Sequence, residues 1–289
     1  MMVGIARLRV TMLCGVFFSL CLFSRAEAPG DPAALVRRAS QNELNASNEG
    51  QPFRYKLHKV DDRGDTTKEI VETNRDGDVA RLIEIAGKPL TSEQEQTELN
   101  RLNNLLQHPE IQEHRRKREK EDSDRANKMI RLLPDAFSYT YQGMMDGPNG
   151  PAYRLSFQPN PAFVPPDREA QVFHGMSGEL WIDKAQERMV KLDAHLFADV
   201  EFGWGILGRL YKGGSILVEQ ADVGDHHWET THLRLDITGK ALLFKTLVIK
   251  TVEDSTDFQP VPREFTYKDA VRLLASGKAG TQAAAARGR

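Results

Sequence analysis

The sequence predicts an α+β protein in which a curved antiparallel sheet has one apolar face and helices cover it. A helical pattern fills residues 91–133, and strand patterns separated by short turns fill most of the chain after Pro134. In residues 188–200, Val190, Leu192 and Leu196 alternate with charged residues, so one face of that strand is apolar. An antiparallel sheet with a single apolar face hides it by curling or by receiving helices.

Composition is that of an ordinary globular protein with a weak negative charge. The chain has 289 residues, 40% of them hydrophobic and 28% charged, and 39 Lys and Arg against 41 Asp and Glu give a net charge of -2. A nucleic-acid-binding protein usually carries an excess of positive charge, so we expect no nucleic-acid partner. We expect one folded domain over residues 29–276.

The N-terminus has the pattern of a secretory signal peptide over residues 1–28. Arg7 and Arg9 precede an uncharged run at 10–24, and the small residues Ala26 and Ala28 offer two alternative cleavage positions. A membrane anchor is the alternative, but the run would rise only about 22 Å as a helix, against a hydrocarbon layer of ~30 Å. We therefore predict export to the periplasm.

Both cysteines, Cys14 and Cys21, lie in this predicted signal. The mature chain would then form no disulfide and offer no thiol nucleophile or thiolate metal ligand. Neither cysteine follows the residue pattern of a bacterial lipid-attachment site. No later segment is apolar for long enough to span a bilayer as a helix.

The first part of the domain is predicted to hold a short helix and then a group of strands. Asp31-Pro32 fits a helix cap and first turn. Polar and apolar residues alternate at 53–58, which predicts a half-buried strand. The strands at 67–73 and 79–85 flank Asp76-Gly77, a dipeptide typical of hairpin turns.

The helical section at 91–133 reads as two helices, because Pro109 removes a backbone donor in its middle. Ser92 and Glu95 have capping-box spacing at its start. The stretch at 111–125 is a charged helical insertion, either a basic docking patch or a solvated face with mixed ion pairs. We favour the solvated face.

Strands are predicted at seven later places, in a meander, and turn residues such as Thr238-Gly239-Lys240 separate them. A short helix is predicted at 268–276, followed by a tail at 277–289 that has little to bury and should be disordered. The predicted strands are 137–142, 152–158, 178–184, 188–200, 215–223, 228–237 and 241–252.

Two motifs suggest binding chemistry and are better explained otherwise. The segment 203–208 (GWGILG) matches the dinucleotide-binding glycine pattern, but strand residues follow it instead of the required helix. A sharp corner in a curved sheet is the better interpretation. On a strand, His226 and His227 would point to opposite faces, and His232 would lie ~20 Å from His226. We therefore expect no metal site and no cofactor.

Catalytic signatures with a fixed local sequence are missing from the chain. Ser177 and Ser215 are candidates for a serine nucleophile only if a remote His and Asp meet one of them in space. Nothing in the surrounding sequence distinguishes either residue from an ordinary turn or strand serine. We therefore expect a protein that is not an enzyme.

Residues 174–215 and 241–262 resemble a group of exported bacterial proteins of unassigned activity. That group is similar to the outer-membrane lipoprotein carrier superfamily, which includes lipoprotein shuttles and receptors and an envelope-stress sensor domain. Residues 178–183 (GELWID) are similar to a superfamily strand with Gly, Trp and Asp at the same spacing, and Asp257-Phe258 falls where Asp-Phe often follows the last long strands. The resemblance spans roughly residues 52–262 in element order.

This resemblance implies an incomplete antiparallel β-barrel whose helices lie across its concave face or mouth and enclose an apolar cavity for acyl chains. The charged insertion at 111–125 and the absence of a lipid-attachment cysteine depart from the superfamily, and they argue against a membrane-anchored receptor. The expected partner is a lipid, an acyl chain or an envelope lipoprotein, with peripheral contact to a membrane as a further option. The candidate lining residues are Ile182, Val190, Leu192, Leu196, Leu233 and Leu235.

Two functions from different classes follow. The leading one is a non-enzymatic exported carrier or binding protein for a hydrophobic ligand. The alternative is a sensing or protein-interaction module of the cell envelope with the same fold and a filled core, for which the same six residues are core residues only. A continuous apolar cavity favours the carrier, and a packed interior favours the module.

Overall fold

The structure, a computed structural model, describes residues 30–202, 208–241 and 245–286. The predicted signal peptide with both cysteines, and residues 203–207 of the glycine motif, lie outside the described residues. In the described ranges, no helix is both long and apolar enough to cross a bilayer.

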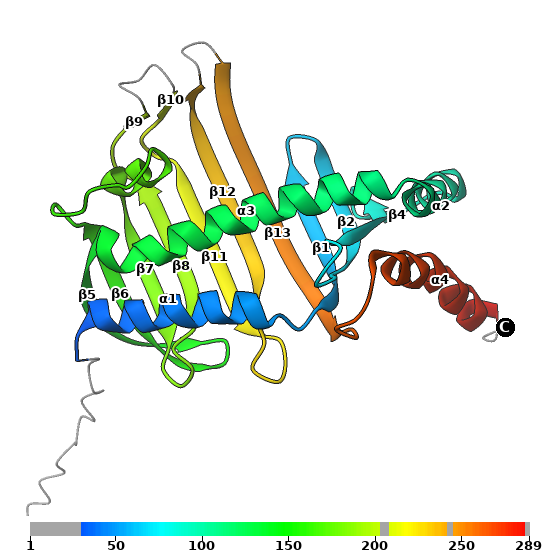
Figure 1. The fold of residues 1–289 in the computed structure, drawn as a ribbon, viewed down its shortest axis with the longest axis horizontal. Helices are drawn as coiled ribbons and strands as arrows, with labels where there is room; N and C mark the ends of the chain where they lie inside the picture. Colours follow the sequence, from blue (N-terminus) through cyan, green and yellow to red (C-terminus); the bar gives the residue numbers. More distant parts are fainter. Residues whose placement is uncertain (1–29, 203–207, 242–244, 287–289) are drawn as a thin grey trace, which may run out of the picture.

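A single antiparallel sheet of 13 strands forms the body of the molecule (Figure 1). Its strands are β1 (Phe53–Asp61), β2 (Gly64–Val71), β3 (Val79–Ile85), β4 (Lys88–Pro89), β5 (Phe137–Gly147), β6 (Gly150–Pro159), β7 (Met176–Asp183), β8 (Met189–Leu196), β9 (Val200–Phe202), β10 (Gly208–Leu210), β11 (Ser215–Asp222), β12 (Trp228–Ala241) and β13 (Lys245–Pro260).

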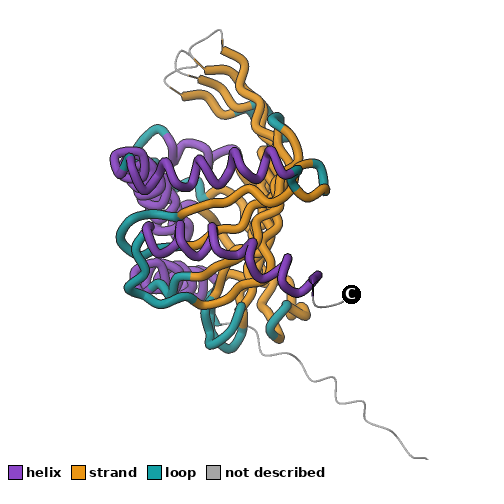
Figure 2. The backbone as a smooth tube through the Cα atoms, turned by 90° about the vertical axis from the view of Figure 1, so that its right-hand side faces the viewer, coloured by secondary structure: helices purple, strands orange, loops and turns teal. Residues whose placement is uncertain are grey.

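The strand order is β4-β3-β2-β1-β13-β12-β11-β8-β7-β6-β5, with β10 pairing to both β12 and β9. The sheet is open, because β4 and β5 end the path without pairing to each other. Figure 2 shows the upper ends of the long strands leaning toward the side on which the helices lie. The predicted α+β fold with an open, curved antiparallel sheet is therefore confirmed. We call the helix side the concave face and the other side the convex face.

Helices α1 (Pro32–Glu49) and α3 (Pro109–Ala136) cross the concave face, and α2 (Ser92–Gln107) and α4 (Tyr267–Ala286) lie at the β1–β4 end. A short 3-10 helix, η1 (Glu169–Gly175), precedes β7. The predicted break between two helices at Pro109 is confirmed. Helix α4 continues to Ala286, whereas the sequence predicted a helix ending at Ser276.

Helix α1 begins at Pro32, where the Asp31 carboxylate caps it by accepting a hydrogen bond from Ala33 N at 3.0 Å. Its apolar face is buried against the sheet. At the far side of the same helix, buried Glu43 accepts two hydrogen bonds from Arg188 at 2.9 Å each and one from Met189 N at 2.8 Å. This buried ion pair fixes the helix to the turn between β7 and β8.

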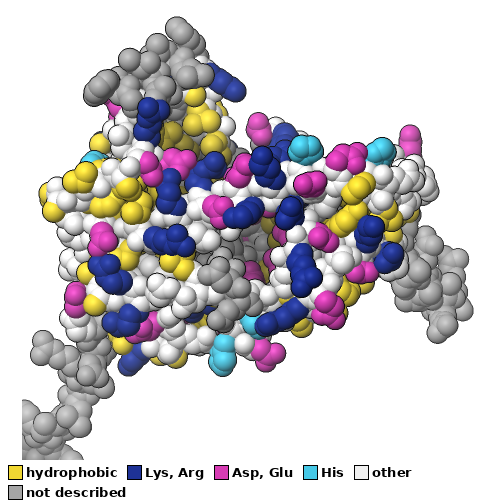
Figure 3. All heavy atoms as spheres, in the orientation of Figure 1, with side chains coloured by type: hydrophobic (Ala, Val, Ile, Leu, Met, Phe, Trp, Pro, Cys, Tyr) yellow, Lys and Arg dark blue, Asp and Glu magenta, His cyan; other side chains and the backbone are white. Residues whose placement is uncertain are grey.

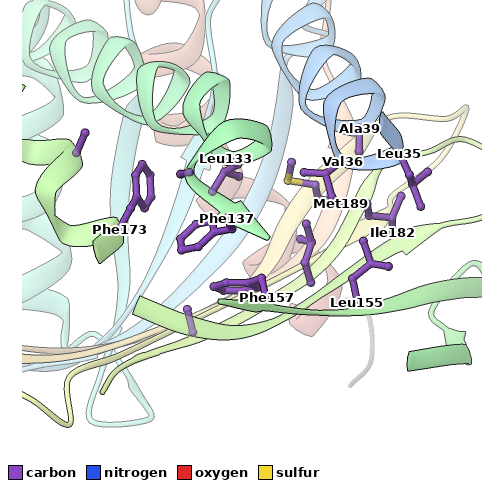
Figure 4. Packing of buried hydrophobic residues seen from close by; sticks show 14 residues of the cluster. Leu35, Val36, Ala39, Leu133, Phe137, Leu155, Phe157, Phe173, Ile182 and Met189 are labelled. Atoms are coloured by element: carbon purple, nitrogen blue, oxygen red, sulfur yellow. The ribbon is translucent and has the colours of Figure 1, made fainter. Parts of the chain in front are cut away.

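The main core lies between α1, the C-terminal end of α3 and strands β5–β8. Figure 4 shows Leu35, Val36 and Ala39 of α1 directed toward the strands that carry Leu155 and Ile182. Its buried members are Leu35, Val36, Ala39, Leu133, Ala136, Phe137, Leu155, Phe157, Ala170, Phe173, Leu180, Ile182, Met189 and Ala194. A second core joins β2 and β3 to α2 and α4, and includes Val71, Val79, Leu102, Leu105, Val271 and Leu274.

Two predicted strand boundaries are wrong. The predicted strand at 188–200 is two strands, β8 and β9, separated by a bend at 197–199. The predicted turn at Thr238-Gly239-Lys240 lies within β12. There Gly239 allows β10 to approach closely, because a Cβ atom would lie 2.3 Å from Arg209 O.

The GELWID segment forms β7, and each of its marked residues has a packing role. A Cβ atom on Gly178 would lie 2.0 Å from Asp193 O of β8, so only glycine allows this strand spacing. Trp181 packs on the convex face against a cluster that contains Trp228. Buried Asp183 ends the strand by accepting hydrogen bonds from Ala185 N at 2.9 Å and Gln186 N at 2.6 Å.

Candidate functional site

The concave face can be traced from the main core outward by strand register. Residues that pair directly across antiparallel strands share a face. Ala194 of β8 belongs to the main core and pairs with Ile216 of β11, which pairs with Leu235 of β12. In the same way Leu192 pairs with Val218, which pairs with Leu233.

These pairings place a continuous apolar surface on the concave face of β11–β13, which we call the apolar strip. Its members are half-buried or exposed, in contrast to the fully buried residues of the main core. Ile249, which pairs with Ile237, is 36% exposed. The strip consists of Ile216, Val218, Leu233, Leu235, Ile237, Leu247 and Ile249.

The strip is incompletely covered because β12 and β13 are longer than the helices above them are wide. Helix α3 crosses the sheet, and the strands continue beyond it (Figure 1). Figure 3 shows hydrophobic side chains on the upper part of this region, above α3. A soluble protein keeps such a surface small unless something binds to it, so the strip is the best candidate for a binding site.

The interior beneath α1 is filled. Leu155, Leu180 and Ile182 are at most 1% exposed there. At the boundary between this core and the strip, a crevice lined by Met176, Leu196 and neighbouring residues has a volume of only about 30 Å³. The cavity of several hundred Å³ expected for an enclosed acyl chain is not formed by these residues.

The six predicted lining residues fall into three groups. Ile182 is fully buried in the main core, and Leu192 packs against that core. Leu196 is buried beside the small crevice. Leu233 and Leu235 are half-buried members of the apolar strip.

Val190 lies on the opposite face from the one predicted. It is buried with Ala152 and Trp228 in a cluster on the convex side. The register between β7 and β8 shifts at this point, because Trp181 pairs with Lys191 while Ile182 pairs with Met189. The extra residue, a β-bulge, puts Met189 instead of Val190 on the concave face.

The histidines singled out in the sequence do not come together. His226 lies in a turn with a positive φ of 63° and contacts Gln186 and Asp222. His232 pairs with Asp254 at 2.7 Å on the convex face. Among the residues that the structure describes, no group of three or more His, Cys, Asp or Glu side chains is arranged to hold a metal ion.

One serine and histidine do meet. Ser177 Oγ lies 3.3 Å from His195 Nε2, as expected for residues that pair directly between β7 and β8. Ser177 is buried, and in the described part of the chain His195 has no carboxylate partner to orient its ring. A hydrolytic triad requires that third group, so this pair does not form one.

Three carboxyl groups, Glu72, Asp78 and Glu229, form an acidic cluster where the β2–β3 hairpin and the start of β12 lie below α3. Burial, with further contributions from neighbouring carboxylates, raises the pKa of Glu72 to about 8 and that of Asp78 to about 7. Burial also raises the pKa of Glu229 to about 7. At neutral pH the cluster therefore carries fewer than three negative charges.

The charged stretch of α3 is only partly the solvated face that we favoured. Lys120 and Asp124 form an exposed ion pair at 2.7 Å, as predicted for such a face. Gln112, in contrast, is 2% exposed and donates hydrogen bonds to Asp76 O and Asp78 O of the hairpin. One turn further along, Glu119 accepts a hydrogen bond from Asp78 N at 2.9 Å. The inward residues have the i, i+3, i+7 spacing of one helix face, a signal hidden by their polarity.

No known family model matches the chain, and no curated protein matches it. Two solved structures are similar. One is a DUF1329 family protein from Desulfovibrio piger, with 12% identity and a TM-score of 0.30, covering 84% of this chain and 99% of that chain. The other is an outer membrane lipoprotein-sorting protein domain from Vibrio parahaemolyticus, with 10% identity and a TM-score of 0.26, covering 83% of this chain and 99% of that chain.

The name of the second structure agrees with the superfamily that residues 174–215 and 241–262 resemble. The α+β assignment itself rests on the strand order and helix positions of this chain.

Proposed function

We propose that this protein is a non-enzymatic binding protein for a hydrophobic ligand, such as a lipid, an acyl chain or the lipid part of a lipoprotein. The observation that carries the proposal is the apolar strip, a continuous hydrophobic surface on the concave face of β11–β13 that α3 leaves incompletely covered. A ligand there would bind in an open groove on the sheet.

The energetic basis is the removal of apolar surface from water on both partners. Each CH₂ group of a bound chain contributes about 0.8 kcal/mol when it is fully buried. Leu233 and Leu235 are the central contact residues in this proposal, with Leu192 and Leu196 at its inner border. Binding of this kind requires no covalent chemistry, which agrees with the incomplete Ser177–His195 pair.

The proposed location is the periplasm, where the predicted signal peptide would deliver the chain. A carrier of lipids between two membranes works in that compartment, and a surface that shields acyl chains from water is what such transport requires.

A second function, a sensing or protein-interaction module of the envelope, is favoured by the filled main core. The side chains of Leu155 and Ile182 leave no room for a ligand under α1. In this alternative the strip would be covered by an apolar surface of a protein partner.

The two functions are separated by titrating the protein with a fluorescent C16 fatty acid. We expect saturable binding to the unmodified chain, and loss of that binding in Leu233→Asp/Leu235→Asp, because each carboxylate would be placed against the acyl chain. Absence of saturable binding by the unmodified chain would leave the interaction module as the better function.

The matched control is Val248→Asp on the adjacent strand β13. Val248 pairs with Thr238, so it lies on the convex face, and it is 54% exposed. This variant introduces the same charge at a similar height on the other side of the sheet and should bind the fatty acid like the unmodified protein. Loss of binding in Val248→Asp alone would place the site on the convex face.

A further inference from the structure

A second cavity, next to the apolar strip, is lined mainly by cations. It has a volume of about 500 Å³ and lies between the β1–β2 hairpin, β3, α2 and α3. Its charged lining residues are Lys59, Arg63, Lys68, Arg101 and Arg115, against the two carboxylates Asp61 and Glu98. We call this cavity the basic pocket.

Most of these cations already have partners. Lys59 contacts Glu253 at 2.6 Å, Arg63 contacts Asp61 at 3.4 Å, and Arg101 contacts Glu98 at 2.7 Å. These pairs stabilise the walls of the pocket and leave little net charge of their own.

Lys68 and Arg115 differ from the other cations. Neither makes an ion pair with any described residue, yet both are half-buried at the same cavity. Burial, and then the neighbouring Arg101, lower the pKa of Arg115, so its charged form is held in an unfavourable environment. An anion between these two side chains would relieve both effects.

We propose that the basic pocket binds a phosphate-class anion, held by Lys68 and Arg115. An Arg guanidinium matches the geometry of phosphate oxygens, and a Lys ammonium adds a mobile positive charge. Two sources share this chemistry: the phosphate headgroup of a lipid and a free phosphate or phosphate ester.

The position of the pocket favours the headgroup. Lys59 on the pocket wall pairs with Glu253 of β13, which pairs with Leu233 of the apolar strip. Two strand spacings, about 10 Å, therefore separate the strip from the pocket wall. A chain on the strip could place a phosphate in the pocket, and this assignment of the ligand as an anionic amphiphile rests on the proposed function.

The test compares three probes by titration calorimetry: dodecyl phosphate, the uncharged dodecyl maltoside, and inorganic phosphate. In Lys68→Gln/Arg115→Gln we expect dodecyl phosphate to bind at least about tenfold more weakly, and dodecyl maltoside to bind as it does to the unmodified protein. The matched control is Lys117→Gln/Arg131→Gln, which removes two exposed cations from α3 and should change neither affinity.

Equal affinity of dodecyl phosphate for the pocket variant and the control would overturn the basic pocket as a site. A charge-retaining variant, Lys68→Arg/Arg115→Lys, should keep the affinity, which separates loss of charge from loss of folding. If inorganic phosphate binds as tightly as dodecyl phosphate and is lost in the pocket variant, the source is free phosphate, and the headgroup assignment is wrong.

Failure of the proposed function has a different signature. In that case dodecyl maltoside would not bind to the unmodified protein, and Leu233→Asp/Leu235→Asp would bind dodecyl phosphate normally. The pocket would still stand if its own variant then lost phosphate binding.

Discussion

At the scale of single residues, Gly178 shows how one position fixes the distance between two strands. Any side chain there would overlap the backbone of β8, since a Cβ atom would also lie 2.8 Å from Ala194 Cα. Because Ala194 belongs to the main core, the strain would spread from the strand pair to the packing under α1.

We predict that Gly178→Ala lowers the free energy of unfolding by about 2–3 kcal/mol, the range for overpacking a rigid site. Urea denaturation measures this change. Gly30→Ala is the control, because no atom lies within 4 Å of its Cβ position, and it should be nearly neutral. An equally stable Gly178→Ala protein would show that β7 and β8 are further apart than described.

At the scale of elements, the contact between α3 and the β2–β3 hairpin combines polar recognition with the acidic cluster. Gln112 and Glu119 hold the hairpin backbone, and Asp78 lies directly beneath the helix. The raised pKa values at this contact make its stability depend on pH. The folded-state pKa of Glu72 is about 8, above its ordinary value of 4.5, so the folded protein binds more protons than the unfolded chain between these two values.

We therefore predict that the free energy of unfolding falls as pH rises from about 5 to about 8, by a few kcal/mol. In Glu72→Gln/Glu229→Gln the fall should be much smaller, and stability at pH 8 should increase. Thermal unfolding at a series of pH values measures both effects, with Glu113→Gln on the exposed side of α3 as the control. A variant that retains the full pH dependence would show that these two carboxyls are solvated.

The same elements show how far the sequence predicts the structure. The alternation at 188–196 correctly indicates a strand with one apolar face, but not the bulge that turns Val190 to the convex side, because a bulge depends on the partner strand. The polarity of 111–125 conceals the inward face of α3, since its contacts are hydrogen bonds to backbone. Lys68 and Arg115 are 47 positions apart in the sequence, and only the folded chain brings them to one cavity.

At the scale of the whole molecule, the pairing of β1 with β13 joins the N-terminal strands to the last long strand. A simple meander does not predict this neighbourhood, because no local pattern marks which distant strands will pair. The pairing is what places the basic pocket of β1–β3 beside the apolar strip of β11–β13. The sheet that results is curved, partly covered and continuous from a cationic end to a hydrophobic middle.

The most direct measurement of hydrophobic ligand binding is native mass spectrometry of the mature protein purified from its own host, followed by solvent extraction. We expect an added mass that organic solvent releases as a lipid or acyl compound, and its absence from Leu233→Asp/Leu235→Asp. A chain that carries no extractable ligand from its host, and that binds no fatty acid when one is supplied, would contradict the proposed function.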